Sequence, residues 1–148
     1  MSLYGRKLSR RSDTICIGIL GKVIEKLHTL AMSLFEKYGG ISTIQSLVRD
    51  FYQDVLASPT LSPFFSNINM QALMGHQVDL FCFIMSGPCS FNLERLRTAH
   101  MGLKISEELF AEVATVLQST LEDHQVEPDD VQQIMETVAS TADLIVRR

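Results

Sequence analysis

The sequence has little that would interrupt helices: only four Pro and eight Gly occur among its 148 residues. No apolar run approaches the roughly 20 residues that a membrane-spanning helix needs. No segment sustains the alternation of apolar and polar residues that is typical of strands. Since 46% of the residues are hydrophobic, the chain can bury a core of its own. These features predict a soluble, globular protein built from helices.

Cysteine is also scarce. The three cysteines, Cys16, Cys82 and Cys89, are odd in number and form no CxxC pair. We therefore expect no disulfide framework, and a reducing cytoplasm is the default location for such a chain. The absence of a CxxCH motif excludes haem attachment of the c type. The net charge of −4 argues against nucleic acid as a partner.

The first 30 residues differ in charge from the rest of the chain. They hold six basic and two acidic residues, a local charge of +4, which leaves −8 for the remainder. A short apolar stretch, Ile15 to Leu20, follows the basic cluster. Three interpretations stay open: an extra amphipathic helix or poorly ordered tail, an arm that binds a membrane surface or a protein, and a cleaved segment that targets an organelle. We divide the chain into this extension, residues 1–30, and a helical domain, residues 31–148.

From residue 27 onward, apolar residues recur every three or four positions, which is the period of an amphipathic helix. Ser42 and Asn69 are predicted to cap two of the helices, Ser106 to start another, and Pro128 to lie in the first turn of the last one. The fold class is all-α, with five or six helices. The apolar stripes cover residues 27–38, 44–56, 70–84, 93–103, 106–121 and 128–145.

Three polar residues, Tyr52, Gln77 and His100, lie on these apolar stripes, and His76 borders one of them. An unpartnered polar group buried on such a face costs ~1–3 kcal/mol. Taken singly, each of these residues could have a local partner in the core. Together they describe an apolar pocket with a few polar groups, which is typical of a site for a small molecule.

The residue types limit what this pocket can hold. Zinc needs three or four nitrogen or sulfur ligands at characteristic spacings, and hydrolysis needs a nucleophile, a base and an orienting acid. Neither arrangement is present in the sequence. Haem needs only one axial imidazole, an apolar slot and a tuned distal side. His100, the Phe-rich segments and the pair Tyr52 and Gln77 would supply these.

Several stretches also match a known family in order and spacing. They are LFEKYGG (34–40), DFYQDVLASPTLSPFF (50–65), NMQALMGHQVDLF (69–81), SGP (86–88), LRTAHMGLKI (96–105) and the helix that Pro128 starts. Through them, about three quarters of the chain resembles a group I truncated haemoglobin. The resemblance implies a two-over-two helical sandwich that binds haem b, iron protoporphyrin IX.

The resemblance also implies roles for single residues. His100 falls on the proximal histidine that ligates the iron, and Tyr52 and Gln77 fall on the distal hydrogen-bonding pair that stabilises a diatomic ligand. Phe65 falls on a phenylalanine that packs on the haem face, and Leu73 replaces the distal histidine of vertebrate globins. Further residues expected to contact haem are Phe51, Leu80, Phe81, Leu96 and Phe110.

His76 leaves two hypotheses open. Some members of the family use a histidine at this position as a second axial ligand, which would give a six-coordinate, bis-histidyl resting iron. Alternatively, His76 faces solvent or a haem propionate. The other two histidines, His28 and His124, are expected at the surface.

The chain also departs from the family pattern. Ser86 stands where the family has a glycine, and residues 91–93 replace an aromatic-x-Gly element, so the loop before His100 is expected to follow a different path. No histidine occurs from Pro128 onward. The histidine-to-vinyl haem bond of some relatives is therefore not expected, and haem would be held without a covalent link.

The resemblance implies reversible binding of dioxygen, nitric oxide or carbon monoxide, with nitric oxide dioxygenase as the leading reactive role and a reductase as partner. We expect a monomer or a weak homodimer. Two alternatives stay open: a bis-histidyl haem that transfers electrons or senses gases, and a haem-free helical module that binds a partner.

Overall fold

A computed structural model describes residues 21–22 and 32–147 of the chain. Its contacts divide the chain into Met1–Met32 and Ser33–Arg148. The predictions made for the extension, and for His28 within it, concern residues that lie outside the described part. Among the described residues, no helix combines the length and the apolar character that crossing a membrane requires.

The second unit is helical, and its described residues contain no strand. The predicted all-α class is thus confirmed, although η1 and α8 are not among the predicted helices. In chain order the elements are α2 (Leu34–Lys37), α3 (Ile41–Ala57), the 3₁₀ helix η1 (Ser62–Phe65), α4 (Met70–Ile84), α5 (Leu93–His100), α6 (Glu107–Asp123), α7 (Pro128–Ser140) and α8 (Ala142–Ile145).

Three of the described helices start where the sequence predicted. The Asn69 side chain accepts a hydrogen bond from the Ala72 amide at 3.2 Å, and the Ser106 hydroxyl accepts one from the Leu109 amide at 3.2 Å. Pro128 is the first residue of α7. The side chains of Asn69 and Ser106 each satisfy an amide that would otherwise lack a partner within the helix.

The predicted cap at Ser42 is wrong, because α3 begins one residue earlier, at Ile41. Gly39 and Gly40 have φ angles of 100° and 76°, a region that glycine enters without a steric penalty. These two residues turn the chain directly from α2 into α3. Ser42 therefore lies inside the first turn of the helix.

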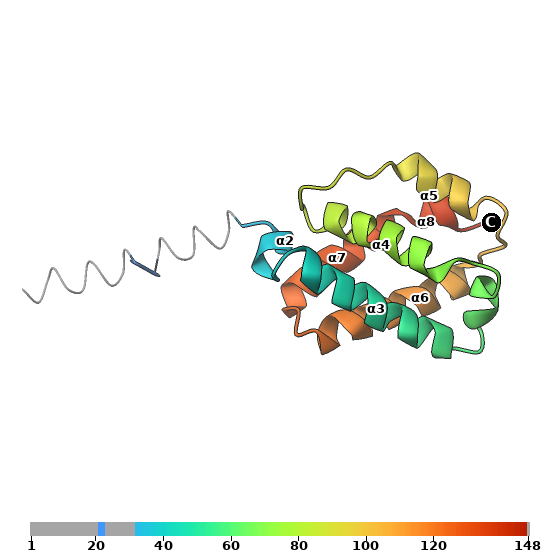
Figure 1. The fold of residues 1–148 in the computed structure, drawn as a ribbon, viewed down its shortest axis with the longest axis horizontal. Helices are drawn as coiled ribbons and strands as arrows, with labels where there is room; N and C mark the ends of the chain where they lie inside the picture. Colours follow the sequence, from blue (N-terminus) through green and yellow to red (C-terminus); the bar gives the residue numbers. More distant parts are fainter. Residues whose placement is uncertain (1–20, 23–31, 148) are drawn as a thin grey trace, which may run out of the picture. The chain divides into compact units, whose positions relative to one another are not determined.

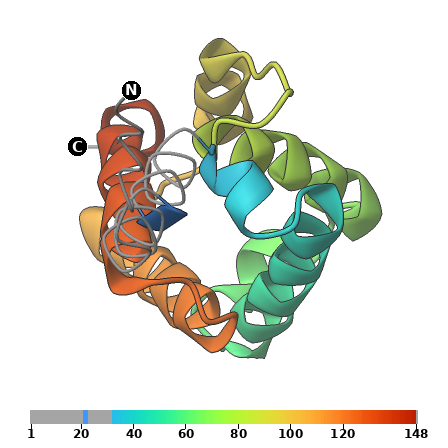
Figure 2. The same cartoon turned by 90° about the vertical axis from the view of Figure 1, so that its left-hand side faces the viewer.

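The long helices pack as two pairs. Helix α3 packs against both α4 and α6, and α6 packs against α7. Figure 2 shows the α3–α4 pair facing the α6–α7 pair, which is the predicted two-over-two sandwich. Helix α5 lies beside α8 at one edge of this sandwich (Figure 1).

The helices contribute unequally to the core. Each fully buried Leu, Ile or Phe side chain stabilises the fold by roughly 1.5–3 kcal/mol. Helix α5 buries only Leu96. Helix α3 buries six side chains, spaced by three or four residues: Ile44, Leu47, Val48, Phe51, Tyr52 and Val55.

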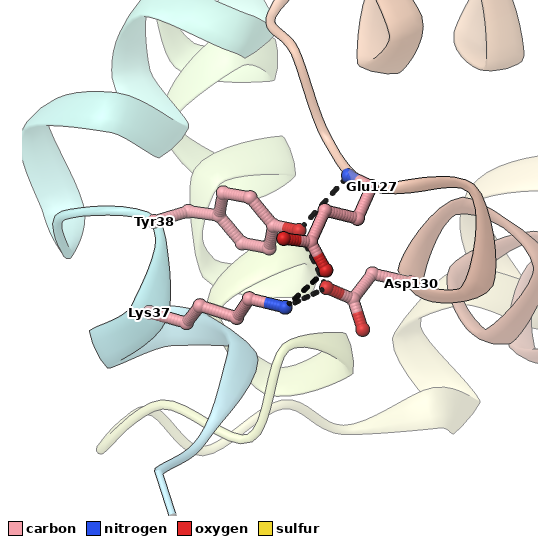
Figure 3. Close-up of polar contacts among 4 residues, drawn as sticks. All are labelled: Lys37, Tyr38, Glu127 and Asp130. Carbon is pink, nitrogen blue, oxygen red and sulfur yellow. Dashed lines mark hydrogen bonds and ion pairs between the residues drawn. The ribbon is translucent and has the colours of Figure 1, made fainter. Parts of the chain in front are cut away.

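A polar cluster joins α2 to the start of α7 (Figure 3). The Lys37 ammonium contacts Glu127 at 2.9 Å and Asp130 at 2.6 Å. The Tyr38 hydroxyl donates a hydrogen bond to Asp130 and accepts one from the Glu127 amide. Burial raises the pKa of Asp130, but the hydrogen bonds from Lys37 and Tyr38 outweigh it and the net pKa is lowered. The cluster therefore ties two segments that are far apart in sequence.

The predicted final helix, 128–145, is divided at Thr141. The Thr141 hydroxyl donates to the Val138 carbonyl at 2.6 Å, a side-chain bond that competes with the helical pattern. The following helix, α8, then packs against α5.

The expectation that His124 lies exposed at the surface is wrong. His124 is only partly exposed, and its Nε2 lies 2.8 Å from an Asp50 carboxylate oxygen on α3. This contact also lowers the pKa of Asp50.

The expectation about the cysteines is wrong. Cys82 and Cys89 form a disulfide, with their Cα atoms 5.8 Å apart. The chain folds back after α4, and Gly87 fits so closely that a Cβ there would lie 2.6 Å from the Phe35 ring and 2.7 Å from the Cys82 sulfur. The odd cysteine count and the absence of CxxC carry no information about this turn, which brings the two sulfurs together.

Candidate functional site

An apolar cavity of about 310 Å³ lies inside the second unit, within the size range of ligand pockets. Helices α3 to α8 and η1 all contribute side chains to its wall. The structure brings together every predicted haem-contact residue except His76. The predicted residues that line the cavity are Phe51, Tyr52, Phe65, Leu73, Gln77, Leu80, Phe81, Leu96, His100 and Phe110.

Of the histidines that the structure describes, only His100 lies on this wall, at the end of α5. Its Nδ1 is 2.7 Å from the Leu96 carbonyl oxygen. Because a carbonyl can only accept, Nδ1 is the nitrogen that carries a proton, and in the neutral ring this tautomer leaves the lone pair on Nε2. This hydrogen bond orients the ring in the way that ligating histidines are usually oriented.

A hydroxyl and an amide meet at another part of the wall. Tyr52, from α3, is only 6% exposed, and its hydroxyl lies 3.4 Å from Oε1 of Gln77 on α4. This contact is long for a hydrogen bond, so the hydroxyl can turn to a better acceptor. Burial raises the pKa of Tyr52 well above its usual value, so the phenol keeps its proton and stays a donor at neutral pH.

Aromatic rings hold Tyr52 in place. The rings of Phe51 and Phe65 pack edge-on against it, with centroids 5.0 and 5.9 Å away. Edge-to-face contacts of this kind are favourable and restrict the ring. The donor is therefore positioned before any ligand arrives.

The cavity also contains residues that the sequence did not single out. Leu103, Val138 and Ile145 lie on predicted apolar stripes, so their helical spacing carried a signal. No sequence signal identified Ile105 and Thr141. They line the cavity only because the chain's last segment meets the segment after α5.

His76 is exposed and is not among the residues that line the cavity. It precedes Gln77 on α4, and neighbouring helix positions point about 100° apart. Ligation by His76 would therefore require α4 to move or turn. Its role as a second axial ligand stays a prediction.

The donor set suits haem better than a bare metal ion. Across the part of the chain that the structure describes, no group of three or more His, Cys, Asp or Glu side chains could hold a metal. An apolar cavity with one available imidazole instead fits haem, in which the ring itself would supply most of the ligands to the iron. The side chains that line the cavity therefore fit haem.

Comparison with known proteins agrees with the geometry. Residues 33–147 match the sequence model of the family described as bacterial-like globin. A group 1 truncated hemoglobin from Chlamydomonas moewusii is 34% identical over 111 residues, which cover 74% of this chain and 65% of that protein. The group 1 truncated hemoglobin GlbN of Mycolicibacterium paratuberculosis is 32% identical over 110 residues, covering 74% and 81% of the two chains.

A solved structure shows the same fold. The 2/2 hemoglobin of Synechococcus sp. PCC 7002, crystallised in the cyanomet state with covalently attached heme, superposes with a TM-score of 0.72 at 27% identity. The match covers 79% of this chain and 100% of that one.

Proposed function

The chain belongs to the bacterial-like globin family as a truncated haemoglobin, and on this premise we propose that it holds haem b without a covalent link and binds dioxygen reversibly. Membership of the family implies haem-based binding of gases. The observation that carries the finer proposal is one cavity lined by His100 and by the Tyr52–Gln77 pair. The absence of histidine from Pro128 to the end of the sequence supports a non-covalent link.

His100 would hold the cofactor, which supplies an iron centre that binds diatomic gases. The Leu96 carbonyl, 2.7 Å from Nδ1, keeps the ring in one tautomer and one orientation. A hydrogen bond to the far nitrogen also raises the basicity of the ligating one. The apolar wall from Phe81, Leu80 and Leu96 excludes water from the slot.

Tyr52 and Gln77 would select among ligands. The Tyr52 hydroxyl and the Gln77 amide nitrogen can both donate, and donors are strongest toward an acceptor that carries negative charge. Dioxygen gains more negative charge than carbon monoxide when it binds a ferrous centre. The pair should therefore favour dioxygen and slow its release.

The same donors support oxidation of nitric oxide to nitrate with dioxygen as the co-substrate. The wall is formed mainly by apolar side chains, which would admit both uncharged gases. Sustained turnover needs a reductase to return the cofactor to its ferrous state. Nitrate formed per nitric oxide consumed, measured with an artificial reductant, tests this activity.

The second hypothesis concerns the resting protein, in which His76 would ligate the iron. If it ligates the iron at rest, a gas must displace it, and apparent affinity falls by the fraction of open protein. The ferric spectrum of the wild type would then be low-spin and that of His76→Ala high-spin. A high-spin wild type at neutral pH would instead leave His76 at the surface, where the structure has it.

Titration of the haem-free chain with haemin tests the central proposal. We expect one equivalent to bind with a sharp Soret band, the ferrous form to bind dioxygen reversibly, and His100→Gly to lose the band. Added imidazole should restore the band in His100→Gly, while His124→Ala serves as a histidine control that changes nothing. A wild type that takes up no haem would contradict the proposal and favour a haem-free interaction module.

A further inference from the structure

Along the chain, the Cys82–Cys89 disulfide lies between Gln77 on α4 and His100 on α5, two of the polar residues that line the cavity. Cys82, in the last turn of α4, is fully buried, five residues after Gln77. Cys89 is half-buried in the loop that runs from α4 to α5 (Figure 1). The bond thus ties the end of α4 to a loop four residues before α5 begins at Leu93.

This bond is the main attachment of the loop. Within the described residues, no main-chain hydrogen bond joins residues 88–91 to another segment. Other contacts of the loop are the packing of Cys89 against the core and a tilted arrangement of the Phe91 and Phe83 rings, with centroids 6.4 Å apart. Without the disulfide, little would hold residues 88–91 on the protein.

Helix α5 depends on attachments at its two ends. It buries only Leu96, and its main packing partner is the short α8. After α5, Arg147 bonds the Met101 carbonyl through its side chain and the Ile105 carbonyl through its amide, both at 2.9 Å. Before α5, the disulfide provides the corresponding anchor.

We propose that Cys82 and Cys89 form a redox-sensitive tether, opened by a dithiol reductant, that controls how firmly α5 and His100 are held. The effect on haem rests on the proposed function, whereas opening of the tether does not. Reduction would loosen the helix that carries the proposed ligand and leave the core on α3 and α4 intact.

One thiolate of the dithiol attacks the Cys89 sulfur, which is the more accessible of the two, and the Cys82–Cys89 bond breaks. Cys82 leaves as a thiolate and takes a proton, which gives a neutral thiol suited to its buried position. The second thiol of the dithiol, as its thiolate, then attacks the mixed disulfide, releasing Cys89 and leaving an oxidised dithiol.

Thiol labelling and proteolysis test the tether without haem. In the oxidised full-length chain, alkylation should spare both Cys82 and Cys89. After dithiothreitol it should modify Cys89 with helix content unchanged, while Cys82 reacts only once the chain is denatured. Chymotrypsin should then cut after Phe91 about tenfold faster, because the loop opens locally. Equal cleavage rates in the oxidised and reduced chains would overturn the proposal.

Transfer of haem from the ferric protein to an acceptor globin tests the effect on α5. Reduction should speed this transfer by about tenfold. Cys89→Ser should be fast under both conditions, and since Ser adds no bulk it leaves the Cys82 site in the core intact. Cys16→Ser and Ser90→Ala are matched controls that should behave as the wild type.

The outcomes separate the two proposals. A chain that binds haem but loses it equally fast in every variant contradicts the control of α5 and leaves gas binding intact. A chain that binds no haem contradicts the proposed function, and its cleavage after Phe91 still decides whether the tether opens the loop.

Discussion

Helices α3 and α5 carry the two chemical sides of the cavity and differ in how they are built. Helix α3 contributes a row of buried side chains to the core, so Tyr52 is placed by the same packing that makes the fold stable. Helix α5 buries Leu96 alone, and His100 is half-buried at its end. The side proposed to contact the gas is therefore placed by the core, whereas the side proposed to hold haem depends on attachments outside the core.

The largest effect on stability is expected from the core of α3. Leu47 is 2% exposed and does not line the cavity, so Leu47→Ala should lower the free energy of unfolding by about 2–5 kcal/mol. Haem loss from the folded protein should stay within about twofold of the wild type, since local opening of α5 is unaffected. Urea denaturation followed by circular dichroism measures the first quantity.

Leu96→Ala on α5 is the matched variant, with Leu96 at 8% exposure. It should cost about 2 kcal/mol or less, because the site can relax at the edge of the sandwich. It should nevertheless speed haem loss more than Leu47→Ala does. The reverse order of haem loss would break the distinction between the two helices.

Tyr52→Phe removes one hydroxyl and keeps the ring contacts with Phe51 and Phe65. A hydrogen bond to a charged acceptor contributes about 1.5–3 kcal/mol, so dioxygen should dissociate roughly 10- to 150-fold faster. Carbon monoxide should dissociate at nearly the wild-type rate. Stopped-flow ligand replacement measures both rates, and an unchanged dioxygen rate would remove Tyr52 from the proposed role.

Asp130 gives the fold a pH dependence at the cluster in Figure 3. Its pKa in the fold is lowered, so its contribution is present above the unfolded value of about 3.9 and is lost as pH falls through the folded value. Asp130→Asn should cost about 0.5–1 kcal/mol at neutral pH, with the difference vanishing in acid. Glu127→Gln, whose side chain is 67% exposed, is the control and should change little. A wild-type and Asp130→Asn pair with parallel pH profiles would contradict this account.

The smallest effect is expected from Arg147→Ala, which removes the side-chain bond to Met101 and leaves the main-chain bond to Ile105. Haem loss should rise about two- to threefold, since an exposed hydrogen bond of this kind contributes about 0.5–1.5 kcal/mol at most. The acceptor-globin assay detects such a change. A rise larger than that of Cys89→Ser would place the main anchor of α5 after the helix instead of before it.

The apolar period and the capping residues predicted α4 and α6 well, and the period alone predicted the body of α3, because these signals act within one helix. Tyr52, Gln77 and His100 were found as polar residues on apolar stripes, a signal that survives without tertiary contacts. The break at Thr141 and the start of α3 at Ile41 were missed, since each depends on a single competing local bond or turn.

Features that depend on contacts between distant segments could not be predicted from the sequence. The disulfide requires the turn at Gly87 to fit against Phe35, more than 40 residues earlier in the numbering. Ile105 and Thr141 reach the cavity only because the chain's end returns to the segment after α5. Neither arrangement produces a periodic pattern of residues in the sequence.

Resonance Raman spectroscopy of the ferrous, ligand-free protein tests the central claim most directly. We predict an iron–nitrogen stretching band that shifts when histidine is labelled with ¹⁵N, disappears in His100→Gly and returns with added imidazole. The same band persisting in His100→Gly without imidazole would show that another residue holds the iron, and would contradict the assignment of His100.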